Sequence, residues 1–367
     1  MSQLIIGIIV IAGIGALLAL LLELAGTFIA DYGLCRLNIN NKKDLEVEGG
    51  NPLLFSLAEQ GIFIPSACGG KGTCAYCKIK VQEGGGPVLP TETPYLSTQE
   101  LEDNVRLSCQ IKVRNDMAIE IPEEFFLIQE FTVRVKNIKN LTHQVKGLSL
   151  EILSPKEGIS FKPGQYIQLE VPKFKLSKEP EFRAFSMANP PQEPLNIELF
   201  VGRVSKGIVS TYLHDYLKEG EDIKVRGSFG EFFYRDSNRD ILMIATGTGL
   251  APIMSILRYI HSENIQRKTT LFFGTRRKED LFCFDELKGL EKHLNDFKFI
   301  PILSREPEDS SWEGKRGRVT ALIENTIKER ADIDVYICGS ADMVESCLER
   351  LINKGIPEGQ IYYDKFT

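Results

Sequence analysis

The sequence predicts four parts in order: an N-terminal transmembrane helix, a small α+β domain, a closed antiparallel β-barrel, and an α/β domain with a parallel sheet. Three observations support this prediction. An uncharged apolar run fills residues 4–22, short strands separated by Gly and Pro turns fill residues 126–235, and strands alternate with helices from residue 238 onward. The length of 367 residues and the composition, 43% hydrophobic and 26% charged, fit two or three globular domains.

Charge and cysteine content exclude some classes of protein. The formal net charge is −6 and no stripe of Lys and Arg stands out, so we expect no nucleic-acid partner. The eight cysteines lack the pattern of a secreted disulfide framework, and no signal-processing site is recognisable after the apolar run. We therefore expect the folded domains to lie in a reducing compartment.

The apolar run predicts a single-pass membrane anchor over residues 1–30. Its 19 uncharged residues, 4–22, match a helix that spans a hydrocarbon layer of about 30 Å and contacts the lipid bilayer. No Lys or Arg precedes the run, whereas Arg36, Lys42 and Lys43 follow it, which predicts that the soluble domains face the cytoplasmic side of the inner membrane. A signal peptide is the alternative, but no basic segment precedes the run.

The next domain is expected over residues 34–122 and combines short strands with one helix. The strands are expected at residues 36–40, 44–48, 79–81, 107–113 and 117–121, and the helix at residues 52–60. The loop after this helix carries most of the chemistry of the domain.

Four cysteines of this domain have the spacing of a two-iron, two-sulfide (2Fe-2S) cluster. Cys68, Cys74 and Cys77 form a Cys-x5-Cys-x2-Cys run, and Cys109 follows after a gap of 31 residues. Glycines within the run let the loop wrap tightly and direct backbone N–H groups at the cluster. A zinc site is the main alternative, but zinc ligands usually come in two closely spaced pairs and Cys109 stands alone. The four thiolates are therefore the predicted cluster ligands.

The barrel is expected over residues 126–235, with strands at residues 131–138, 148–153, 166–171, 196–201 and 222–225. Two motifs within it suit FAD. Arg183-Ala184-Phe185-Ser186 offers a guanidinium for a pyrophosphate, an aromatic face, and a hydroxyl for the flavin ring. Gly207-Ile208-Val209-Ser210-Thr211 opens a helix whose N–H groups and dipole favour the same pyrophosphate.

The last domain, residues 238–367, has the strand–turn–helix rhythm of a dinucleotide site. The strand at residues 241–246 leads into Gly247-Thr248-Gly249 and a helix at residues 253–261. Because ligands bind at the carboxyl ends of such strands, Thr275, Arg276 and Cys338-Gly339 are expected to line a nicotinamide nucleotide cleft. Arg276-Arg277 and Ser304-Arg305 leave open whether NADH or NADPH binds there.

Taken together, these residues resemble the ferredoxin-NADP reductase superfamily fused to a ferredoxin. More closely, the chain is similar to the F-subunit family of the sodium-translocating NADH:quinone reductases. The likeness extends through the apolar helix, the cysteine run, and segments 183–189, 227–233, 311–314, 338–339 and 363–366. It implies that Arg183, Phe185 and Ser186 hold FAD, that Ser210 and Thr211 take its pyrophosphate, and that Phe366 stacks on the flavin until nicotinamide displaces it. It also implies that Ser186, Glu231, Cys338 and Phe366 border the site of hydride transfer.

The sequence departs from that family at three places. The segment from Tyr166 to Arg183 is shorter, Phe185 replaces a tyrosine, and the nucleotide turn reads Gly-Thr-Gly-Leu-Ala-Pro. These departures affect the identity of the partner more than the chemistry.

The function expected from the sequence is an NADH dehydrogenase that passes hydride to FAD and single electrons through the cluster. The acceptor would be a membrane redox subunit or a quinone-linked acceptor, within a sodium-translocating reductase. The alternatives are the reductase component of an oxygenase or hydroxylase, a standalone membrane-anchored NAD(P)H reductase, and a redox sensor without turnover. The apolar helix argues against a soluble oxygenase reductase, and the combination of nucleotide turn, Cys338 and Phe366 argues against a sensor.

Overall fold

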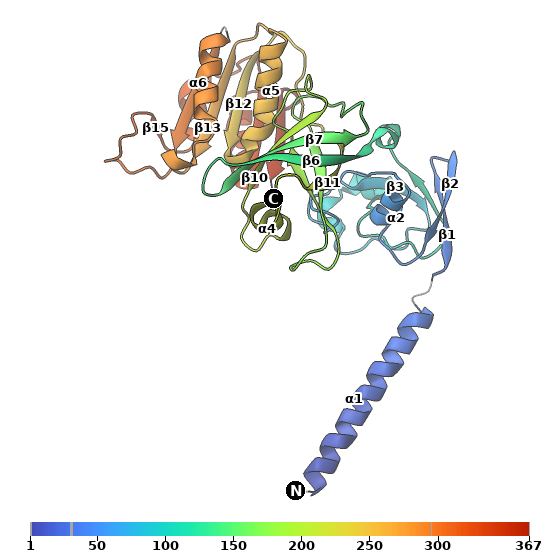
Figure 1. Ribbon diagram of the computed structural model, residues 1–367. Coiled ribbons are helices and arrows are strands. Elements are labelled where there is room, and N and C mark those ends of the chain that lie inside the picture. Colours follow the sequence, from blue (N-terminus) through green and yellow to red (C-terminus); the bar gives the residue numbers. More distant parts are fainter. Residues whose placement is uncertain (1, 30–31, 295, 367) are drawn as a thin grey trace. The chain divides into compact units, whose positions relative to one another are not determined.

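The computed structural model describes residues 2–29, 32–294 and 296–366, and within the first helix it describes side chains only for residues 5–21. The chain divides into two compact units, residues 1–66 with 70–127, and residues 67–69 with 128–367. Helix α1 spans Ser2–Ile29, so the predicted helix is present (Figure 1). Among the described residues, no helix combines the length and hydropathy needed to cross a membrane. Met1 and Ala30, at the ends of the predicted anchor, lie outside the described residues.

The first unit contains a five-stranded mixed sheet in the order β2-β1-β5-β3-β4. Its strands are β1 Leu34–Ile39, β2 Lys43–Glu48, β3 Lys78–Glu83, β4 Val105–Leu107 and β5 Met117–Glu120. Strands β1 and β5 pair in parallel and the other neighbours are antiparallel. Helix α2, Leu53–Glu59, contributes Leu53 and Leu57 to the core of this sheet, and the short helix α3 spans Thr98–Glu102.

The prediction of one strand in this unit was wrong. The sequence predicted a strand over residues 107–113, but β4 ends at Leu107 and no strand occupies residues 108–113. The chain turns instead, because the N–H of Gln110 donates to the carbonyl of Leu107 at 2.8 Å. This turn carries Cys109, so local backbone hydrogen bonding overrides the strand-like alternation of apolar residues.

The barrel is a six-stranded antiparallel sheet in the order β10-β7-β6-β11-β8-β9. Its strands are β6 Gln129–Asn140, β7 Val145–Ser154, β8 Tyr166–Val171, β9 Glu181–Ser186, β10 Asn196–Gly202 and β11 Asp222–Phe229. A bridge between Met187 and Leu199 joins the two edge strands, and the N–H of Ala188 donates to the carbonyl of Glu198 at 2.8 Å. The predicted closed antiparallel barrel is therefore present.

The remaining domain has a parallel six-stranded sheet in the order β15-β14-β13-β12-β16-β17. Its strands are β12 Asp240–Thr246, β13 Thr269–Thr275, β14 Phe297–Leu303, β15 Lys315–Arg316, β16 Ile333–Ser340 and β17 Ile361–Phe366. Helices α5 Leu250–Ser262 and α6 Phe284–His293 pack on one face of the sheet, and α7 Val319–Thr326 and α8 Ala341–Asn353 on the other. The strand order reverses between β12 and β16, the position where such sheets bind ligands.

Candidate functional site

The cysteine loop lies between α2 and β3. Cys68, Cys77 and Cys109 are buried, and Cys74 is half-buried. Cys77 lies directly before β3, and the N–H of Ser108 donates to the carbonyl of Cys77 at 2.9 Å, next to the point where β3 and β4 pair. Backbone pairing therefore fixes the separation of Cys77 and Cys109, although 31 residues lie between them in the sequence.

Two glycines let this loop fold against its neighbours. Gly70 has φ +85°, and a Cβ there would lie 2.7 Å from the ring of Phe55. Gly72 has φ +74°, and a Cβ there would lie 2.6 Å from the side-chain nitrogen of Gln110. Positive φ favours glycine at both positions, and an added Cβ would also have to displace the neighbouring side chain. The N–H of Gly70 also donates to the hydroxyl of Ser66 at 3.0 Å, which tightens the loop.

The electrostatics of the paired thiols suit a cationic metal cluster. A hydrogen bond with Cys109, burial, and the charge of Cys109 raise the pKa of the Cys77 thiol far above its usual range. Two buried thiolates are therefore stable side by side only where a bound metal cation compensates their charge. The hydroxyl of Ser108 is fully buried and has no partner among the described residues.

Within the described chain, no three His, Cys, Asp or Glu side chains are grouped as the ligands of a metal ion. The assignment of four ligands therefore rests on sequence spacing and stays a prediction.

Gln110 is a residue of this site to which the sequence assigned no role. Its side-chain amide donates to the sulfur of Cys109, with a nitrogen–sulfur distance of 3.5 Å. The signal available in the sequence is its position directly after the fourth cysteine.

The predicted flavin residues of β9 lie at the closing edge of the barrel. Ser186 is buried, whereas Phe185 is half-buried against the barrel core. The guanidinium of Arg183 donates to the carbonyl of Phe182 at 2.5 Å and to the carboxylate of Glu181 at 3.3 Å. These three residues, at positions 183, 185 and 186, offer one cation, one aromatic face and one buried hydroxyl, which suits a flavin and its phosphates.

The expected phosphate-binding helix is α4, Ile208–Asp215, with Gly207 at its N-cap. The first N–H groups of a helix have no partner within it, so Ile208 and Val209 can present donors to an anion. Ser210 acts differently from the expectation for its side chain. Its buried hydroxyl bonds to the backbone of Val204 and to the carbonyl of Gly207, at 3.1 to 3.2 Å, so it fixes the turn before the helix.

The nucleotide turn, Gly247–Gly249, joins β12 to α5 at the switch point of the parallel sheet. Gly247 has φ +53°, and a Cβ there would meet no atom within 4 Å, so its backbone faces open space. Gly249 is the opposite case, because a Cβ there would lie 2.3 Å from the carbonyl oxygen of Cys338. Thr248 lies next to Gly202 at the end of β10, which brings the turn to the barrel. The open side of Gly247 fits the pyrophosphate of a dinucleotide.

The other residues predicted for hydride transfer have different environments. Cys338 is fully buried, and burial followed by the charge of Asp364 raises the pKa of its thiol. Strand β17 pairs with β16 so that Phe366 lies opposite Ser340, and Phe366 packs against the core cluster that contains Cys338. The side chain of Glu231 is 86% exposed and forms an ion pair with Arg235 at 3.5 Å.

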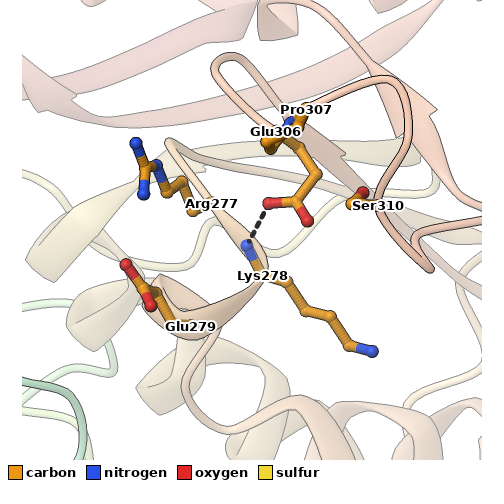
Figure 2. Close-up of a pocket in the computed structure, with 6 residues that line it drawn as sticks. All are labelled: Arg277, Lys278, Glu279, Glu306, Pro307 and Ser310. Carbon is orange, nitrogen blue, oxygen red and sulfur yellow. Dashed lines mark hydrogen bonds between the residues drawn. The ribbon is translucent and has the colours of Figure 1, made fainter.

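A surface pocket of about 610 Å³ lies at the carboxyl ends of β13 and β14. Its lining residues are Arg277, Lys278, Glu279, Glu306, Pro307 and Ser310. The carboxylate of Glu306 points to the backbone of Lys278 and accepts its N–H at 2.9 Å (Figure 2). Thr275 and Arg276 adjoin this pocket in sequence, and Arg276 is exposed.

Three family models match the chain in the order of its domains. The "2Fe-2S iron-sulfur cluster binding domain" matches residues 37–114, the "Oxidoreductase FAD-binding domain" residues 132–234, and the "Oxidoreductase NAD-binding domain" residues 243–349. Together with the cysteine loop, the barrel and the switch-point turn, they define an oxidoreductase that takes electrons from NADH through FAD and a 2Fe-2S cluster.

Curated relatives specify the family. The chain is 33% identical over 404 positions to the F subunit of the Na(+)-translocating NADH-quinone reductase of Neisseria meningitidis serogroup C, covering 99% of each protein. It is 32% identical over 408 positions to the F subunit of the same enzyme of Methylococcus capsulatus, covering 100% of each. The chain belongs to the F-subunit family of the Na(+)-translocating NADH-quinone reductases.

Solved structures support the same architecture. An Amycolatopsis cytochrome P450 reductase is 25% identical with a TM-score of 0.73, and covers 91% of this chain and 99% of its own. A ferredoxin reductase in carbazole 1,9a-dioxygenase is 26% identical with a TM-score of 0.71, with the same coverage. The three-domain core is thus shared with reductases of other systems.

Proposed function

We propose that this chain is the electron-input subunit of a membrane-bound, sodium-translocating NADH:quinone reductase, with a membrane redox partner as acceptor. The observation that supports this most is the extent of the match to the F subunits of these enzymes. That match covers 99% of the 367 residues and therefore includes the N-terminal helix. The reductases of oxygenases match 91% of the chain.

Within this proposal, each cofactor has its own set of residues. When bound, FAD accepts a hydride from NADH and releases electrons singly to the cluster. Arg183 and the N-terminus of α4 hold the FAD pyrophosphate, while the hydroxyl of Ser186 bonds to the flavin ring. The nucleotide turn at Gly247 receives the pyrophosphate of NADH, and the buried Cys338 and Phe366 border the nicotinamide.

Helix α1 is proposed to be the single-pass anchor, with the folded domains on the cytoplasmic side of the inner membrane. The large apolar side chains described between Ile5 and Leu21 are more than half exposed, for example Ile9 at 65% and Ile11 at 73%. A helix that exposes apolar side chains on all sides is stabilised by lipid rather than by water. Attachment also keeps the cluster near its acceptor and raises the effective concentration there.

The alignment also indicates where the chain differs from its relatives. It spans 404 positions, which exceeds the 367 residues of this chain by 37, so the relative contains positions that have no counterpart here. We propose that the loop between β8 and β9 is one such place, as expected from the sequence. This loop is short, and Phe174 within it packs on Tyr212 of α4 and on Tyr216, directly after the helix, at ring distances of 5.1 and 5.3 Å.

A deletion of residues 2–31 tests this function in membranes that contain the other components. The deleted chain should still reduce ferricyanide with NADH, since its three cofactor domains are intact, but should lose NADH-driven quinone reduction. Quinone reduction at the rate of the full chain would contradict the anchored subunit. If the chain instead delivers electrons to a component of an oxygenase, the alternative function is supported, namely the reductase of an oxygenase system such as carbazole 1,9a-dioxygenase.

A substitution of Cys74 tests the order of electron transfer. The C74A variant should lose the EPR signal of the reduced cluster while NADH still bleaches the flavin absorption. If flavin reduction were lost together with the cluster signal, the proposed order would be wrong.

A further inference from the structure

We propose that Gln110 sets the reduction potential of the iron–sulfur cluster by donating an N–H···S hydrogen bond to Cys109. The side-chain nitrogen lies 3.5 Å from the sulfur, within the range of hydrogen bonds to sulfur. An amide oxygen cannot donate, so the NH2 group is the end that a thiolate binds. The proposal rests on Cys109 being a cluster ligand, as assigned in the proposed function.

The surroundings hold the amide in this position. The N–H of Gln110 donates to the carbonyl of Leu107 at 2.8 Å, which fixes the turn that carries both residues. On its other side the amide packs against Gly72 so closely that a Cβ there would lie 2.6 Å from the nitrogen. The amide is therefore confined between the cysteine loop and the fourth ligand.

Such a bond acts differently on the two oxidation states of the cluster. One electron that arrives from NADH through the flavin converts one iron from the ferric to the ferrous state and adds negative charge that the thiolate sulfurs share. A donor to a thiolate stabilises the more negative state more, so it raises the potential. The half-buried position of Gln110 limits screening by water.

The experiment measures the midpoint potential of the cluster by redox titration with EPR in the full, cofactor-loaded chain. In Q110M the side chain keeps its length but loses the donor, so we expect a more negative potential, with the equilibrium constant changed about five- to tenfold. A tenfold change is about 59 mV for one electron. Q110E adds a negative charge and should shift the potential further in the same direction. The flavin potential should be unchanged.

The matched control is Q82M. Gln82 lies in β3 of the same domain, is exposed, and donates to Glu120 rather than to a cysteine. Its replacement should leave the cluster potential unchanged. A Q110M protein with a full cluster, NADH-reducible flavin and the wild-type potential would overturn the role of Gln110 while leaving the proposed function intact.

A second measurement tests the hydrogen bond in the wild-type protein, and it remains available if the Q110M variant does not bind the cluster. Wild-type protein with ¹⁵N in the glutamine side-chain amides should show a ¹⁵N coupling to the reduced cluster in pulsed EPR, because the nitrogen is 3.5 Å from the ligand sulfur. Absence of this coupling would overturn the proposal, because it would show that the side-chain nitrogen of Gln110 does not contact a cluster ligand.

Discussion

The carboxylate of Glu92 and the guanidinium of Arg106 form a buried ion pair with a nitrogen–oxygen distance of 2.6 Å, and their side chains are 0% and 6% exposed. Glu92 also accepts the N–H groups of Leu89 and Leu107, at 2.9 and 3.0 Å. Arg106 donates to the carbonyls of Gly85, Gly86 and Pro87. The pair thus ties the long loop after β3 to β4, the strand that leads to Cys109.

Removing the charge of Glu92 should destabilise the iron–sulfur domain. The E92Q variant keeps the shape and an acceptor but leaves the guanidinium buried without its counter-charge, a change that typically costs about 3–5 kcal/mol. Thermal unfolding of the full chain, followed by loss of cluster absorption, should show a clear fall in stability. The control is E100Q, which breaks a pair with Lys78 whose side chains are 30% and 32% exposed. That pair should contribute no more than about 1 kcal/mol. Equal losses of stability in the two variants would show that the buried pair does not stabilise the domain more than the partly exposed pair.

The sequence predicted the order and type of the domains because their signals are local. The Cys68–Cys77 run, the strand alternation and the Gly247–Gly249 turn each depend on neighbours within about ten residues, and only Cys109 lies farther along the chain. The pairing of Glu92 with Arg106 has no such local signal, because charged residues are expected at the surface. The roles of Gln110 and of the Ser210 hydroxyl also depend on contacts that only the folded chain defines. The strand predicted over residues 107–113 failed for the same reason, since the turn at Cys109 is not visible in apolar alternation.

Replacing Gly249 should weaken NADH binding. Gly249 has φ −60°, which alanine adopts readily, so the effect of G249A is steric. The added Cβ would lie 2.3 Å from the carbonyl oxygen of Cys338, and backbone atoms cannot move aside as a flexible side chain does. We expect a loss of about 1–3 kcal/mol in stability of the nucleotide domain and a raised KM for NADH, with FAD and cluster content unchanged.

The control for this prediction is G289A in α6, where a Cβ would meet no atom within 4 Å. Alanine in a helix interior is favoured over glycine by about 1 kcal/mol, so G289A should be neutral or stabilising. A G249A variant that behaves like G289A would contradict the tight packing of the nucleotide turn on β16.

The stability of the barrel should depend on pH through His214. Burial lowers the pKa of this histidine, outweighing its 3.0 Å bond to the carbonyl of Val201, which raises it. The folded state therefore holds the ring neutral, whereas the unfolded chain protonates near pH 6.5. The free energy of unfolding therefore has its full value above pH 6.5. Below pH 6.5 it decreases, by at most about 1.4 kcal/mol per pH unit, because the unfolded chain binds a proton that the folded chain does not. Denaturant unfolding at pH 7.5 and 5.5 measures this loss.

A substitution isolates the contribution of His214. The H214Q variant keeps a donor for Val201 but does not titrate, so its loss of stability between the two pH values should be smaller than that of the wild type. H261Q, at an exposed position near the end of α5, should behave as the wild type. An unchanged pH dependence in H214Q would assign the effect to other groups.

Glu306 should favour NADH over NADPH at the pocket shown in Figure 2. The N–H of Lys278, then the hydroxyl of Ser310 and nearby arginines, lower the pKa of this carboxyl below its usual range despite some desolvation, so it is ionised at neutral pH. A carboxylate accepts hydrogen bonds from ribose hydroxyls and repels a 2′-phosphate. The E306Q variant should therefore raise kcat/KM for NADPH relative to NADH by about five- to tenfold, since a negative charge beside the cationic residues Arg277 and Lys278 is then removed. E308Q, an exposed neighbour outside the pocket lining, should leave the ratio unchanged. Steady-state kinetics with both nucleotides measure the ratio of the two kcat/KM values. An identical ratio in E306Q and the wild type would show that Glu306 does not discriminate between NADH and NADPH.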